Sequence, residues 1–121
     1  MTAGEAITRL DELEPNQFTQ AQKLRWLSNL DGRLFEELVK THEDPIRESF
    51  TAYTATTDEL LVPEPYADCL YNWYLQAMIA AENSEDASYE QLRVRYNDAL
   101  RQFGDWYNRT HRPKGGARFW F

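Results

Sequence analysis

The chain has 121 residues and a formal net charge of −7. A chain of this length forms one domain that buries roughly two-thirds of its unfolded surface, so folding requires neither disulfides nor metals. Cys69 is the only cysteine, which excludes an intramolecular disulfide and fits assembly in the cytoplasm. No stretch approaches the ~20 apolar residues of a membrane span, and no secretory signal pattern is present, so we expect no membrane partner.

Two helices are predicted in the first 42 residues. The first covers residues 2–13, because Thr2 and Glu5 have capping-box spacing and Pro15 bars continuation. The second begins after Thr19, which forms a second capping box with Gln22. Its leucines recur at helical spacing up to Leu38. The stretch "NLDG" (29–32) predicts a break or kink, with Asp31 capping a second helix at a break, because Asn29, Asp31 and Gly32 are poor in helix interiors. A merely weak turn of the helix is the alternative.

Residues 43–65 lose the helical period. This stretch holds three prolines and two short apolar clusters, the first with Phe50 and Tyr53 and the second with Leu60, Leu61 and Val62. A loop of this length in a small domain is usually functional or disordered. The apolar clusters argue against disorder, so we expect an irregular loop, with a short β-hairpin as an alternative.

Two long helices are predicted in the second half of the chain, and a helical hairpin of the two is the expected core. The third runs through "PYADCLYNWYLQAMIAAEN" (65–83), whose apolar stripe is predicted to include Tyr66, Cys69, Leu70, Trp73, Ala77 and Met78. The fourth carries an a/d seam spaced 3, 4, 3, 4 and 3 residues apart, formed by Tyr89, Leu92, Tyr96, Ala99, Phe103 and Trp106. The predicted fold is therefore an all-α small bundle built on this hairpin.

Catalytic and metal-binding signatures are missing from the sequence, and neither an enzyme nor a cofactor is expected. His42 and His111 lie at the predicted ends of helices without a second ligand at helical spacing, which indicates solvent-exposed helix-terminal charges. The adjacent acids at 36–37 and 43–44 point about 100° apart on a helix and indicate solvated faces. Cys69 is expected to be a small buried apolar residue.

The C-terminal residues 113–121, "PKGGARFWF", are predicted to form an extended arm beyond a helical domain of residues 1–112. Residues 101–121 carry five basic side chains and one acid, a net charge of +4, so residues 1–100 carry −11. Such asymmetry is typical of an interaction tail, and the acidic body argues against wrapping nucleic acid. Aromatic residues make up 14% of the chain. Because Trp26, Tyr71, Tyr74 and Tyr107 fall off the predicted stripes, this excess favours partner binding, with coverage of the bundle ends as the alternative.

Three segments carry a family resemblance best: "LDG" (30–32), "LLVPEPY" (60–66) and "DWYNRTH" (105–111). Over nearly its whole length the chain resembles a family of small prophage proteins. These are head–tail connector (adaptor) proteins of tailed phages that infect Gram-positive bacteria. The resemblance implies an α-helical subunit that assembles with neighbouring copies into a ring beneath the portal protein, at the head–tail junction of the virion. DNA would pass through the lumen without specific binding, and a tail-side stopper protein would follow.

The resemblance also assigns sites. The portal-binding arm would comprise Arg112, Lys114, Arg118, Phe119, Trp120 and Phe121, and the loop facing neighbouring subunits or the stopper would use Phe50, Tyr53, Leu60, Leu61 and Val62. The alternative that the residues leave open is a small cytoplasmic helical protein-binding module, such as an inhibitor or antitoxin. A monomeric or dimeric state would favour that alternative over a ring.

Overall fold

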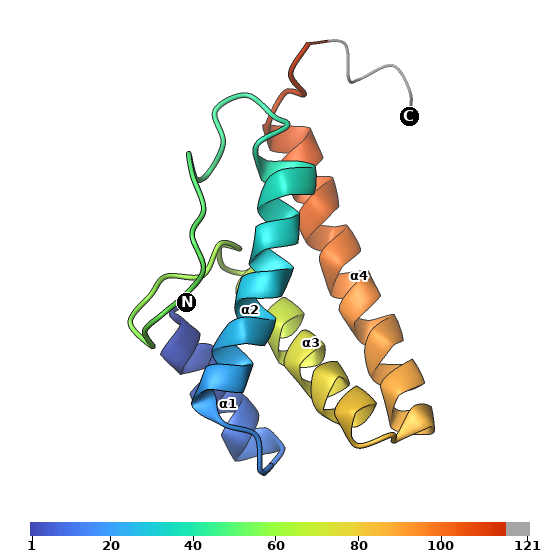
Figure 1. Ribbon diagram of the computed structural model, residues 1–121. Coiled ribbons are helices and arrows are strands. Elements are labelled where there is room, and N and C mark those ends of the chain that lie inside the picture. Colours follow the sequence, from blue (N-terminus) through green and yellow to red (C-terminus); the bar gives the residue numbers. More distant parts are fainter. Residues whose placement is uncertain (116–121) are drawn as a thin grey trace.

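The fold is a helical bundle, seen in a computed structural model that describes residues 1–115 (Figure 1). The helices are α1 (Ala3–Leu13), α2 (Gln20–Leu34), α3 (Tyr66–Glu82) and α4 (Asp86–Thr110). A single π-helical turn, η1 (Phe35–Val39), continues α2. Within residues 1–115 no strand forms, and β pairing is limited to two isolated bridges. The all-α prediction is therefore confirmed.

Both predicted capping boxes are present. The Glu5 backbone N–H donates to Thr2 Oγ1 at 3.2 Å, and the Thr2 N–H donates to the Glu5 carboxylate at 2.8 Å. Thr19 and Gln22 exchange the equivalent pair of bonds at 2.9 and 3.2 Å. These local signals fix where α1 and α2 begin, because each box satisfies two N–H groups that have no partner inside the helix.

The predicted break at residues 29–32 is wrong, because α2 runs through this stretch without interruption. Asp31 does not cap a helix. Its side chain is fully buried on the inner face of α2 and accepts hydrogen bonds from two other segments of the chain. Tertiary hydrogen bonds thus outweigh the weak helix propensity of this sequence.

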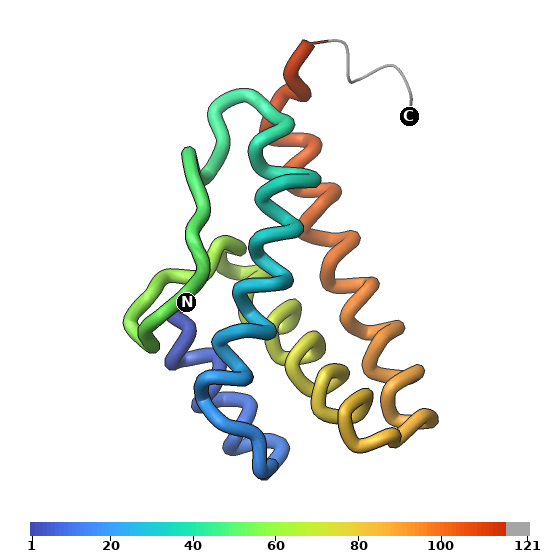
Figure 2. The backbone as a smooth tube through the Cα atoms, in the orientation of Figure 1, coloured from blue at the N-terminus to red at the C-terminus, as the bar shows by residue number. Residues whose placement is uncertain are grey.

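The stretch of residues 43–65 contains no helix, as predicted, and no strand, so the β-hairpin alternative is wrong. It runs beside α2 and back to the start of α1 (Figure 2). Ala3 N–H donates to Asp58 O at 2.9 Å, and Gly4 N–H donates to Thr56 O at 2.8 Å. A Cβ at Gly4 would lie 3.0 Å from both Thr56 Cβ and Thr56 O, so this close approach requires glycine.

The α3–α4 hairpin is confirmed as the most extensive packing of two elements, but the predicted face of α3 is partly wrong. Leu70 and Ala77 are buried as expected, whereas Cys69 is exposed and Trp73 only half-buried. The buried face instead includes Tyr71, Tyr74, Leu75 and Ile79. The reason is that α3 packs against α1, α2 and α4, so its buried surface is wider than one stripe and rotated from it.

The seam of α4 is buried unevenly. Phe103 is fully buried, whereas Leu92, Tyr96 and Ala99 are half-buried. The main packing partner of α4 is α3. A seam that faced the centre of a closed bundle would be fully buried, so the other helices cover the N-terminal half of α4 only in part. Val94 consequently exposes 64% of its surface. Leu27 and Leu34 of α2 belong to the core, and Leu38 of η1 packs at its edge.

Candidate functional site

The described part of the C-terminal arm is bound to the end of the bundle where α2 and α4 converge (Figure 1). The Glu43 N–H donates to Arg112 O at 2.7 Å, and the Lys114 N–H donates to Thr41 O at 3.0 Å. Pro113 forms an isolated bridge with His42. The arm therefore leaves the domain at a defined point beside residues 41–43. The predicted site residues Arg112 and Lys114 are exposed at this point. The other four residues of the predicted arm site lie outside the described residues: Arg118, Phe119, Trp120 and Phe121.

Aromatic and imidazole rings stack beneath this attachment point. The predicted exposure of His42 is wrong: its side chain is buried, with Nε2 2.7 Å from Asn108 Oδ1 and Nδ1 2.8 Å from Leu38 O. The His42 ring packs edge-on against Tyr107, and the Tyr107 ring stacks on His111 at 4.0 Å between centroids. The Tyr107 hydroxyl donates to Val39 O at 3.0 Å. These contacts join η1 and the residue His42 after it to the end of α4, and they hold the base of the arm.

The loop residues predicted to face other subunits are mostly used inside this chain. Tyr53, Leu60, Leu61 and Val62 are buried in the core, and Phe50 is half-buried against Phe35 and Tyr53. Their assignment to a subunit interface stays a prediction. If the loop does contact another subunit, the contact would be made by the exposed loop residues that lie between these buried side chains in the sequence.

Asp31 anchors this loop through a buried network. Its carboxylate accepts hydrogen bonds from the Tyr53 hydroxyl at 2.5 Å, the Tyr71 hydroxyl at 2.8 Å and the Leu61 N–H at 3.1 Å. Burial raises the pKa of Asp31 to about 6, although the three donors act in the opposite direction. Burial, with the neighbouring Asp31 charge, also raises the pKa of both tyrosines. The sequence signal for this role is that Asp31 lies on the apolar stripe, four residues after Leu27.

The aromatic excess has a largely structural explanation. Trp26, Tyr71, Tyr74 and Tyr107, which fall off the predicted stripes, are all buried in the core. Phe18 packs edge-on against Trp26, and the Tyr74 hydroxyl donates to Trp26 O at 3.2 Å. These four residues therefore give no support to partner binding. Coverage of a small bundle, the alternative interpretation, accounts for them.

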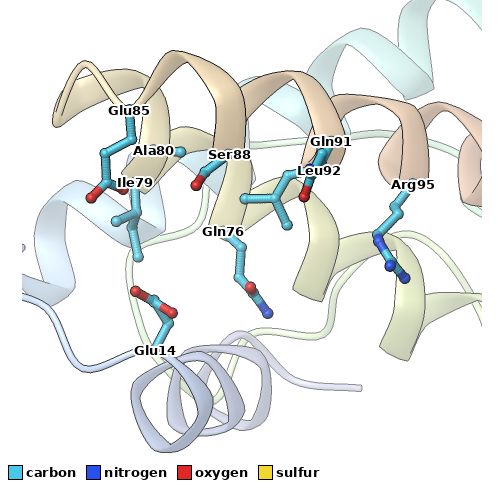
Figure 3. Close-up of a pocket in the computed structure, with 9 residues that line it drawn as sticks. All are labelled: Glu14, Gln76, Ile79, Ala80, Glu85, Ser88, Gln91, Leu92 and Arg95. Atoms are coloured by element: carbon cyan, nitrogen blue, oxygen red, sulfur yellow. The ribbon is translucent and has the colours of Figure 1, made fainter.

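A pocket of about 220 Å³ lies between the end of α1 and the tip of the α3–α4 hairpin (Figure 3). The carboxylates of Glu14 and Glu85 are at one end and the Arg95 guanidinium is at the other, with Ser88 between them. Within residues 1–115 no histidine, cysteine or lysine lines the pocket, and its ionisable side chains are those of Glu14, Glu85 and Arg95. Among residues 1–115 no group of three His, Cys, Asp or Glu side chains is arranged to hold a metal ion.

A second hollow, here called the α2–α4 groove, has a volume of about 280 Å³. Leu30, Leu34, Tyr96 and Leu100 provide apolar walls, and the exposed Arg33 and Glu37 stand at its edge with Asn97. The Tyr96 ring lies 5.4 Å from the Tyr74 ring, and burial raises the Tyr96 pKa to about 12. Within residues 1–115 neither Arg33 nor Glu37 forms an ion pair. The groove is thus apolar inside and has one charge of each sign at its rim.

Comparisons of the chain with known protein families, with curated proteins and with solved structures found no match. Across residues 1–115, none of the helices has the length and apolar character to cross a bilayer.

Proposed function

We propose that the chain is a non-enzymatic structural protein of a tailed phage or prophage, a head–tail connector that forms a ring with other copies of itself. In this proposal the ring assembles in the bacterial cytoplasm, joins the portal protein of the DNA-filled head to the stopper on the tail side, and lets DNA pass through its lumen. The proposal rests on the resemblance of the sequence to connector proteins and on the C-terminal arm.

The single observation that supports it best is the fixed origin of the arm. Backbone hydrogen bonds of Arg112 and Lys114 to residues 43 and 41 fix the point from which the basic, aromatic segment continues. An arm with a defined origin loses less conformational freedom when it binds than one tethered by a loose linker. In a ring, the arms would bind one portal together and gain avidity.

A charged surface also fits a DNA channel. Residues 1–100 carry a net charge of −11, and an acidic lumen would repel the phosphates of passing DNA. The DNA would slide through without binding specifically.

The test is co-purification of the chain with the portal protein encoded beside it. Replacing Phe119, Trp120 and Phe121 by serine should abolish co-purification while leaving far-UV circular dichroism unchanged. The matched control is Leu13→Ser, because Leu13 is an apolar side chain on α1 with 52% of its surface exposed, away from the arm. This control should retain the portal. Co-purification that survives the loss of the three aromatics would contradict the assignment of the arm.

The small protein-binding module remains the second candidate, because a basic, aromatic arm equally suits binding of one host target. Mass in solution distinguishes the two. A closed ring in the presence of the portal supports the connector, whereas a monomer or dimer that binds one cellular protein and ignores the portal supports the module.

A further inference from the structure

The α2–α4 groove and the C-terminal segment have complementary chemistry. The groove offers the apolar side chains of Leu30, Leu34 and Leu100, and the segment "ARFWF" (117–121) offers three aromatic rings. A volume of about 280 Å³ falls just below the ~300–1,000 Å³ of small-molecule pockets, so it suits a single anchoring side chain. At the rim, Glu37 has no ionic partner within residues 1–115, and Arg118 supplies a cation.

The segment starts close enough to reach the groove in its own chain. Lys114 N–H is bonded to Thr41 O, which fixes residue 114 beside the end of η1. Glu37 lies four residues before Thr41 and Leu34 lies seven before it, which is at most about 6 and 10 Å at the rise of an α-helix, and the π-helical turn of residues 35–39 shortens this path. Six extended residues from Lys114 to Trp120 span up to ~20 Å. The segment can therefore turn back along α2 with length to spare.

The order of side chains also matches. In an extended segment residues i and i+2 share a face about 7 Å apart, so Arg118 and Trp120 point the same way. Moving from Thr41 into the groove, Glu37 is met first, and Arg33 with Leu34 follows one helical turn, 5.4 Å, further on. Arg118 would thus meet Glu37, while Trp120 would enter between Leu34 and Leu100. A guanidinium such as that of Arg33 stacks favourably on an indole ring.

We propose that the α2–α4 groove binds the chain's own C-terminal segment, with Trp120 as the anchor in the groove and Arg118 paired with Glu37. The bound segment keeps its aromatic rings out of water before a partner is met. Attachment to any partner then requires the segment to leave the groove. This inference does not depend on the connector function, because it concerns the isolated chain.

Fluorine NMR of the full-length chain labelled with 5-fluorotryptophan tests the proposal. Each of the four tryptophans is assigned by its Trp→Phe variant, and the solvent isotope shift between H₂O and D₂O reports how far each indole is exposed. The Trp120 signal should show a small shift, close to that of the buried Trp26, at every protein concentration. A full, solvent-exposed shift for Trp120 would overturn the proposal.

Charge variants then locate the binding site. Glu37→Arg should move the Trp120 isotope shift most of the way to the exposed value, and adding Arg118→Glu should restore it by reversing the pair. Glu36→Arg is the matched control, since Glu36 is an exposed neighbour that pairs with Lys40 outside the groove. A protected Trp120 that ignores Glu37→Arg would refute the groove as its site. Protection that disappears on dilution would show that a second copy supplies the segment, and would equally overturn the intramolecular proposal.

Discussion

Replacing Asp31 by asparagine should remove a specific pH dependence of the free energy of unfolding. Asparagine keeps the shape of the side chain and an oxygen that accepts from Tyr53 or Tyr71, but it does not titrate near neutral pH. The comparison therefore isolates the buried carboxyl from every other acid of the chain. The informative quantity is how the difference in free energy of unfolding between wild type and Asp31→Asn changes with pH. The size of this difference at a single pH is not informative, because the amide also alters the hydrogen bonds at every pH.

The magnitude follows from the pKa of Asp31, which burial raises from 3.8 to about 6. Between these two pH values the folded chain binds a proton at Asp31 that the unfolded chain has lost. Stability contributed by this group is therefore fully present below pH 3.8 and is lost as the pH rises through 6. A displacement of about two pH units corresponds to about 3 kcal/mol. Between pH 3.5 and 7.5 the free energy of unfolding of the wild-type chain should therefore fall by about 3 kcal/mol relative to that of Asp31→Asn.

Urea unfolding followed by tryptophan fluorescence, at low micromolar protein across this pH range, measures the difference. Asp58→Asn is a control of opposite sign. The Asp58 carboxylate is exposed, and hydrogen bonds from the Thr54 and Ala55 N–H groups lower its pKa. Its contribution to stability is present at neutral pH and is lost as the pH falls. If the difference between wild type and Asp31→Asn stays constant with pH, the buried-carboxylate argument is refuted.

Three further outcomes are expected. Phe103→Ala should destabilise the fold by about 3–5 kcal/mol in urea unfolding, because Phe103 is fully buried, whereas Leu92→Ala should cost clearly less, because Leu92 is half-buried. Gly4→Ala should destabilise the fold by about 1–3 kcal/mol and speed hydrogen exchange at Ala3, since the new Cβ would press against Thr56. The purified chain should not bind duplex DNA at physiological salt in a fluorescence anisotropy titration; micromolar, salt-sensitive binding would contradict the passive role given to its acidic surface.

The sequence predicted what local rules decide. Thr2 and Thr19 start helices because their partners lie three residues away, and the long spacing pattern of α4 requires no knowledge of distant residues. Asp31 and His42 were mispredicted because their partners, Tyr71 and Asn108, lie 40 and 66 residues away. A polar residue with low helix propensity can be buried inside a helix only when a distant part of the chain supplies its hydrogen-bond partner, and a local pattern does not reveal that partner.

The candidate site divides in the same way. Composition alone singles out the basic, aromatic C-terminal residues as a candidate arm, since charge can be counted without a fold, and their role in binding stays a prediction. The α2–α4 groove could not be predicted, because it exists only where α4 packs on α3 and leaves Tyr96 half-covered. The role of Tyr107 was mispredicted because periodicity describes one helix face, whereas α4 contacts both α3 and η1.

The pairing of the first residues with residues 56–60 has a consequence for the order of events during protein synthesis. The N–H groups of Ala3 and Gly4 bond to carbonyls of residues 58 and 56, and Leu60 N–H donates to Met1 O. These acceptors and donors leave the ribosome only after more than fifty further residues have been made. The hairpin of α3 and α4, whose contacts are close in sequence, closes without waiting for a distant segment. Because residues 56–60 are made before α3 and α4, α1 can be fixed in place before that hairpin exists, whereas a nascent chain halted before residue 56 leaves the start of α1 without these backbone partners.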